Sequence, residues 1–114
     1  MSLESDLIAA LNPLVGNRVH LAILPLNVTM PAIRLSVIAV TPDNTVCGAS
    51  DLDDYRVQID VFGPNYGALV ALRRLVFDAV DAAFPLAIRL NDMTDYDADL
   101  KLHRRIIEVQ IPAE

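Results

Sequence analysis

Three aspartates alternate from Asp95 through Asp97 to Asp99, with the spacing that begins an EF-hand calcium-binding loop. That loop also needs a glycine at its sixth position for a sharp turn and a bidentate glutamate at its twelfth. In this chain the two positions hold Leu100 and Ile106. The sequence therefore predicts a solvated acidic turn and no designed metal site.

A second acidic cluster, Asp51, Asp53 and Asp54, lies where a polar loop becomes a strand. Paired carboxylates can divide acid and base work when burial separates their pKa values. No apolar residues around this cluster indicate a pocket, so we interpret it as solvated. Together with Asp43 and Asn44 of the preceding loop, we expect it to contact a partner.

The only cysteine, Cys47, could in principle act as a nucleophile with His20 or His103 as its base. No orienting motif surrounds Cys47, and the adjacent Gly48 favours a loop over the helix N-terminus that would lower the pKa of the thiol. The chain also lacks the glycine-rich phosphate-binding motifs and the common hydrolase motifs. We therefore expect no enzyme activity and no cofactor.

Two short basic pairs, Arg73-Arg74 and Arg104-Arg105, stand in an acidic chain of fifteen Asp and Glu against nine Lys and Arg. With a formal net charge of −6, two such pairs do not make the basic stripe that grips nucleic acid. We expect both pairs to meet an acidic surface on a neighbouring copy, which the aspartate clusters can supply. Arg73 and Arg74, with Asp95, Asp97 and the other aspartate cluster, are the residues that we expect at the contacts between copies.

The strongest fold signal in the chain is a strand, a turn and a helix that follow one another in residues 55–84. Apolar and polar residues alternate from Tyr55 to Phe62, and the glycine- and proline-containing residues 63–67 then break the strand. Apolar residues next recur at helical spacing until Pro85, which predicts a long amphipathic helix. We interpret the polar face of the strand as solvated or facing another subunit; its residues are Arg56, Gln58 and Asp60.

Weaker patterns predict the other elements. A short helix begins at a Ser2 or Ser5 cap and ends at Leu11. We expect strands at residues 18–24, 32–41, 86–90 and 100–111, with residues 42–50 as an extended hairpin loop.

Two of these strands have an unusual apolar pattern. Residues 37–40 are apolar at both parities, which predicts burial on both faces of the strand. The final strand changes apolar parity after Leu102, which predicts a β-bulge at residues 105–107.

The length of 114 residues predicts a single domain, 1–114, and the apolar content of 54% is high for so small a domain. The excess favours association with other copies. We expect an α+β fold with a mainly antiparallel or mixed sheet of four to five strands, a short N-terminal helix and one long helix. No signal peptide is apparent, and no apolar run is long enough to span a membrane.

Nearly the whole chain resembles the bacteriophage tail-completion proteins, also called tail-terminator or tail-to-head joining proteins. Residues 56–66 carry most of the resemblance, with residues 1–4, 14–18 and 95–97 in support. Phe62 stands where many relatives have tryptophan, which keeps the apolar parity of the strand.

The resemblance implies a non-catalytic virion protein, found in the tail or neck and in the bacterial host cytoplasm during assembly. It implies a ring, typically a hexamer, that completes the tail and contacts tail-tube and head-connector proteins. DNA passes through such a ring without specific binding, which suits an acidic chain. The alternative is a non-catalytic accessory domain of bacterial or prophage origin that binds a small molecule or a protein partner.

Overall fold

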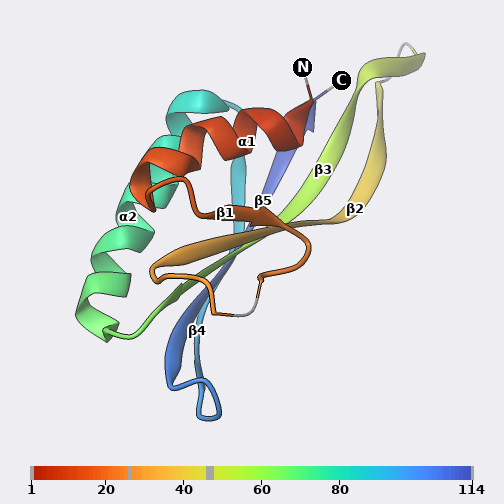
Figure 1. Cartoon of the computed structure of the whole chain (residues 1–114). Helices are drawn as coiled ribbons and strands as arrows, with labels where there is room; N and C mark the ends of the chain where they lie inside the picture. The colour runs from red at the N-terminus through yellow and green to blue at the C-terminus, as the bar shows by residue number, and fades with distance from the viewer. Residues whose placement is uncertain (1, 26, 46–47, 114) are drawn as a thin grey trace.

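Five strands form one mixed sheet, and two α-helices cover one of its faces (Figure 1). The computed structural model describes residues 2–25, 27–45 and 48–113. The elements are, in order, α1 (Leu3–Leu11), the 3-10 helix η1 (Asn12–Leu14), β1 (Val19–Leu21), β2 (Ala32–Thr45), β3 (Gly48–Gly63), α2 (Tyr66–Ala83), β4 (Ile88–Asp97) and β5 (Leu102–Ala113). The sheet order is β1-β2-β3-β5-β4, with β1 parallel to β2 and the other neighbours antiparallel. The predicted α+β class is confirmed.

The long helix α2 forms as the sequence predicts. The Asn65 side chain caps it by accepting a hydrogen bond of 2.9 Å from the backbone N–H of Ala68. Leu69, Leu72 and Val76 face the sheet and are buried. The helix ends just before Pro85, as expected. Within the described residues, no helix is long and apolar enough to cross a membrane.

The core lies between the helices and the sheet, and alternate residues of β3 form its centre. Val57, Ile59 and Val61 have no exposed surface. They pack with buried residues of both helices, β2 and β5: Leu3, Leu7, Leu11, Ile33, Leu35, Leu69, Leu72, Val76, Phe77, Val80, Ile107, Val109 and Ile111. Because β3 is paired on both sides, its inward residues have neighbours from every layer. The period-2 pattern of residues 55–62 therefore predicted the core strand correctly.

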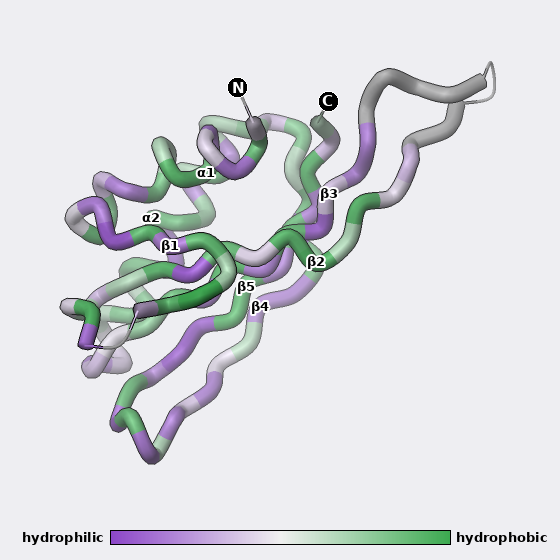
Figure 2. The backbone as a smooth tube through the Cα atoms, turned by 45° about the vertical axis from the view of Figure 1, so that its right-hand side comes forward, coloured by the Kyte–Doolittle hydropathy of each residue, from purple (hydrophilic) through white to green (hydrophobic). Residues whose placement is uncertain are grey.

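One end of the sheet projects beyond the helices as a hairpin arm, residues 37–54 of β2 and β3 (Figures 1 and 2). The chain is elongated as a result, with extents of 51 × 24 × 23 Å. The prediction of an extended loop at residues 42–50 is wrong for the described part. The strands stay paired as far as Thr45 and Gly48, and a register shift between Pro42 and Asn44 accommodates the proline.

The predicted β-bulge at residues 105–107 is also wrong. β5 pairs with β3 without a register shift from residue 103 to residue 113. The parity change has another cause: Leu102 lies on the face of the sheet that no helix covers, whereas Ile107 lies on the core face. The bulge near this edge is in β4, between Arg89 and Asn91. β4 also extends to Asp97, so it includes residues predicted to form an acidic connection.

Two isoleucines provide a matched test of where the stability resides. Ile59 is fully buried at the centre of the sheet, and Ile38 on the arm is 45% exposed. We expect Ile59→Ala to lower the free energy of unfolding by about 3 kcal/mol, because it leaves a cavity in a packed core. Ile38→Ala should cost less than about 1 kcal/mol. Urea denaturation of the two variants measures the difference, and equal losses would contradict this description of the core.

Candidate interaction surfaces

Asp60 of β3 is the most buried charged residue described, although it lies on the sheet face without helices. Arg34 of β2 donates to one carboxylate oxygen through Nε and Nη2, at 3.1 and 2.8 Å. Arg104 of β5 donates to the other oxygen, at 3.2 and 3.0 Å, and Gln58 donates at 3.1 Å. The two guanidinium groups also lie 5.5 and 5.8 Å from the Phe62 ring centroid.

The prediction that the polar face of β3 is solvated or faces another subunit is therefore wrong for Asp60, which is buried within its own chain. A carboxylate with no exposed surface is stable only when charged donors satisfy it. Gln58 is half-buried beside it. Arg56, nearer the arm, is exposed and pairs with Glu108 at 3.0 Å.

On the core face, Asp92 of β4 joins α2 to the edge of the sheet. It accepts hydrogen bonds of 2.6 Å from Nε of Arg73 on α2 and 2.6 Å from Nε of Arg105 on β5. Burial alone would raise the pKa of Asp92, but the two arginines hold that pKa below its usual value. The same contact raises the pKa of Arg105. This cluster fixes the orientation of α2 on the sheet.

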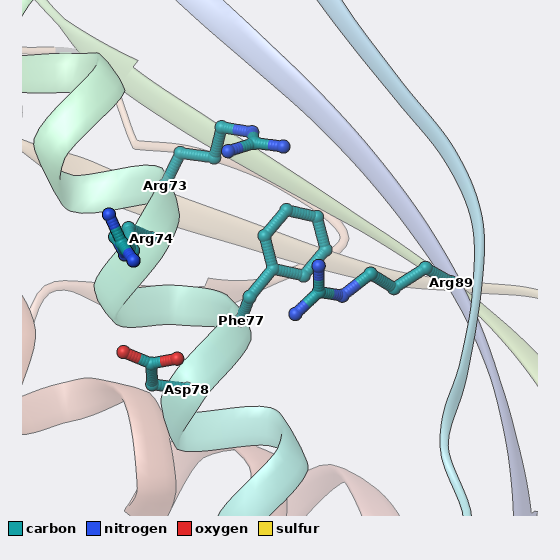
Figure 3. A pocket seen from close by; sticks show the side chains of 5 residues that line it. All are labelled: Arg73, Arg74, Phe77, Asp78 and Arg89. Atoms are coloured by element: carbon teal, nitrogen blue, oxygen red, sulfur yellow. The ribbon is translucent and has the colours of Figure 1, made fainter.

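Arg73 and Arg74 are adjacent in sequence but point in different directions (Figure 3). Arg73 points toward the strands, where its guanidinium lies 4.9 Å from the Phe77 ring centroid. Arg89 of β4 covers the same ring at 3.9 Å. Arg74 points away from the sheet, near Asp78, and no ion pair of the described residues includes it.

Three of the four arginines expected to meet a neighbouring copy are thus paired within the chain. Arg73 and Arg105 contact Asp92, and Arg104 contacts Asp60. Spacing along the sequence could not show this, because the partners lie on other strands. Arg74 is the arginine of these pairs that keeps the predicted outward position.

The predicted aspartates lie at two opposite ends of the sheet. Asp53 and Asp54 lie on the arm and are half-buried, and the backbones of Asp43, Asn44 and Asp51 lie nearer its tip. The structure does not bring these residues near the β4–β5 turn (Figure 1). Their role in contacts between copies stays a prediction.

The β4–β5 turn explains the alternating aspartates. The Asp97 side chain accepts hydrogen bonds from the backbone N–H groups of Asp99 and Leu100, at 3.0 and 3.1 Å. This is a turn-closing use of aspartate. Asp95 is exposed on β4, with a carboxylate oxygen 4.0 Å from Arg104. Among the described residues, no three His, Cys, Asp or Glu side chains are grouped to hold a metal ion.

The histidines considered for catalysis lie on different strands. His103 of β5 contacts the rings of Tyr66 and Tyr96, with centroids 5.6 and 4.8 Å away. His20 is half-buried on β1, and its Nε2 has no hydrogen-bond partner among the described residues. Cys47 lies outside the described residues.

The exposure of several apolar side chains on the arm was not expected from the sequence. Val37, Ile38 and Val40 of β2 are 36%, 45% and 50% exposed. The expectation that residues 37–40 are buried on both faces is wrong for the isolated chain, because β2 leaves the body of the domain at this point. An apolar hollow of about 420 Å³ also opens beside α2, with Leu75 at its rim and 50% exposed.

The pKa of Asp92 predicts how stability depends on pH. The folded-state pKa lies below the usual 3.8, so the unfolded chain binds the proton more tightly. The stabilisation that the ionised Asp92 provides is complete above the unfolded-state pKa, near 3.8, and is lost as the pH falls through the lower folded-state pKa. We expect the difference in unfolding free energy between the wild type and Asp92→Asn to be constant above about pH 5 and to shrink below pH 3.8.

Asp81→Asn is the matched control for this series, because the Asp81–Arg89 pair is exposed and contributes little. Denaturant titrations at several pH values measure both differences. A difference for Asp92→Asn that does not change in acid would contradict the assigned role of the Asp92 cluster.

The fold and these surfaces can be compared with known proteins. A family model described as "Tail completion protein gp17" matches residues 6–113. Among solved structures, a chain from "Virion of native gene transfer agent (GTA) particle" is similar in fold, with a TM-score of 0.70 and 15% identity. The alignment covers 97% of this chain and 93% of that chain. The comparison with curated proteins found no match.

The family match begins within α1 and extends over the sheet and α2, including the Asp60 and Asp92 clusters. It agrees with the resemblance seen in the sequence around residues 56–66. The chain belongs to the tail completion protein gp17 family, a family of structural, non-enzymatic components of phage-type virions.

Proposed function

We propose that this chain forms an oligomeric ring that completes the tail of a phage-type particle and joins it to the head connector. The observation that carries the proposal is the family match over residues 6–113. The family favours this function over the alternative of a small-molecule-binding accessory domain. The partners would be other copies of the chain, tail-tube proteins and head-connector proteins.

The surfaces of the domain support a role in assembly. Several large apolar side chains are exposed at both ends of the elongated chain, including Ile38 and Val40 on the arm and Leu100 at the β4–β5 turn. A small domain that exposes such residues at separate places is suited to contact several neighbours.

The charge of the chain suits a conduit for DNA. The formal net charge is −6, and most arginines of the two basic pairs are neutralised by aspartates of the same chain. Such a surface repels a phosphate backbone and lets it move past without specific binding.

Deletion of the gene in the phage or prophage that carries it tests the proposal. We expect heads and tails that are not joined, with tails of abnormal length, because the end of the tail is no longer closed and offers no surface to the connector. Electron microscopy of the lysate measures both features. A plasmid copy of the wild-type gene should restore joined particles, which excludes an effect on neighbouring genes. Normal virions after deletion would overturn the proposal.

A further inference from the structure

The arm presents a continuous apolar strand that this chain does not cover. Residues 37–40 are Val, Ile, Ala and Val, and all four are exposed although they point to both faces of β2. Four consecutive exposed apolar residues are not expected on a surface that stays in contact with water. Among the described residues, β1 pairs with β2 only as far as Leu35, so the outer edge of β2 is also unpaired along the arm. An open apolar edge of this kind is a site for association.

A complementary hollow lies beside the N-terminal half of α2. Its volume is about 420 Å³, and its lining is almost entirely apolar. Leu69 and Leu72 are its buried side chains. Ala68, Ala71 and Leu75 are its exposed residues on α2, and Pro31 and Pro64 line it from the preceding loops.

The arm and the N-terminal half of α2, which lines the hollow, lie at opposite ends of the domain (Figure 1). The arm therefore cannot reach the hollow of its own chain. It can fill the hollow of a second copy.

The charges beside the two surfaces are also complementary. Asp53 and Asp54 of β3 are the direct cross-strand partners of Pro42 and Thr41, next to the apolar residues of the arm. On α2, Arg74 is adjacent to Leu75 and points outward (Figure 3). Arg74 lines a second hollow with Arg73, Phe77, Asp78 and Arg89. Arg73 and Arg89 are paired there with Asp92 and Asp81, whereas no ion pair of the described residues includes Arg74. Asp53 and Asp54 of one copy are thus complementary in charge to Arg74, which lies near the apolar hollow of another copy.

We propose that the arm of one copy lies across α2 of the next copy, with residues 37–40 in the hollow beside Leu75 and with Asp53 and Asp54 facing Arg74. Each chain has one arm and one hollow, so the two surfaces in contact differ, and every copy can bind one neighbour through its arm and another through its hollow. We call this arrangement a head-to-tail contact between subunits. Head-to-tail contacts of this type close into rings when the rotation between copies permits it. The inference rests on the proposed ring and specifies how its subunits touch. It also explains why residues 37–40 have the sequence pattern of a strand buried on both faces.

Disulfide cross-linking of the purified, concentrated chain tests the contact. In a Cys47→Ala background, a chain with Ile38→Cys is mixed with a chain with Leu75→Cys. We expect a cross-linked dimer of the two chains. The matched control replaces Leu75→Cys by Met93→Cys on the edge strand β4, because Met93 is 44% exposed, close to Leu75 at 50%. The absence of the first product, or a dominant second product that indicates edge-to-edge pairing with β4, overturns the proposal.

Mixing of two charged variants tests the direction of the contact. One variant carries Ile38→Asp and Val40→Asp on the arm, and the other carries Leu75→Asp at the hollow. All three positions are exposed, so the thermal unfolding midpoints should match that of the wild type. Each variant alone should associate at least about tenfold more weakly than the wild type, because a charge replaces an apolar contact.

The mixture should form pairs that do not grow, since only one intact arm and one intact hollow remain between the two chains. Sedimentation analysis measures the size of these species. A mixture that behaves like the separate variants contradicts a head-to-tail contact. If these tests fail while deletion of the gene still leaves heads and tails unjoined, the contact is wrong and the proposed function stands.

Discussion

The domain depends on a buried carboxylate that joins the three middle strands of its sheet. Asp60 has no exposed surface and lies between Arg34 of β2 and Arg104 of β5. Helices cover only one face of the sheet, so on the other face these long side chains exclude water instead. Removal of one partner from a buried ion pair typically costs about 3–5 kcal/mol, because the remaining charge is left uncompensated. Asp60, Arg34 and Arg104 can therefore meet only when β2, β3 and β5 pair in this register.

The opposite face is held by apolar burial and by a second ionic cluster. Asp92 joins Arg73 of α2 to Arg105 of β5, and Arg89 lies over the Phe77 ring between the helix and the sheet. The chain thus uses most of its arginines to hold its own strands and helix together. It leaves an outward region around Arg74 and an apolar arm that no other part of the described chain covers. Contacts within the chain therefore hold the fold, while the arm and the region around Arg74 stay exposed for assembly.

The parts of the fold that depend on local periodicity could be predicted from the sequence. The strand of residues 55–62, the α2 helix and the α+β class follow from patterns within each segment. The parts that depend on pairing between distant strands could not. The partners of Asp60 and Asp92, the length of β4 and the position of its bulge all require the register of the sheet. The apolar pattern of residues 37–40 indicated burial, but these residues are exposed in the isolated chain. The pattern agrees instead with burial in an assembly.

If the arm docks on α2 of the next copy, the exposed apolar residues of this virion protein become buried only in the assembled particle. Hydroxyl-radical footprinting of the isolated chain and of intact particles tests this burial directly, because labelling reports the exposure of each side chain. We expect labelling of Ile38, Val40 and Leu75 to fall strongly in the particle, whereas buried Ile59 stays unlabelled in both samples. Equal labelling of Ile38 and Val40 in the isolated chain and in the particle would contradict the docking of the arm.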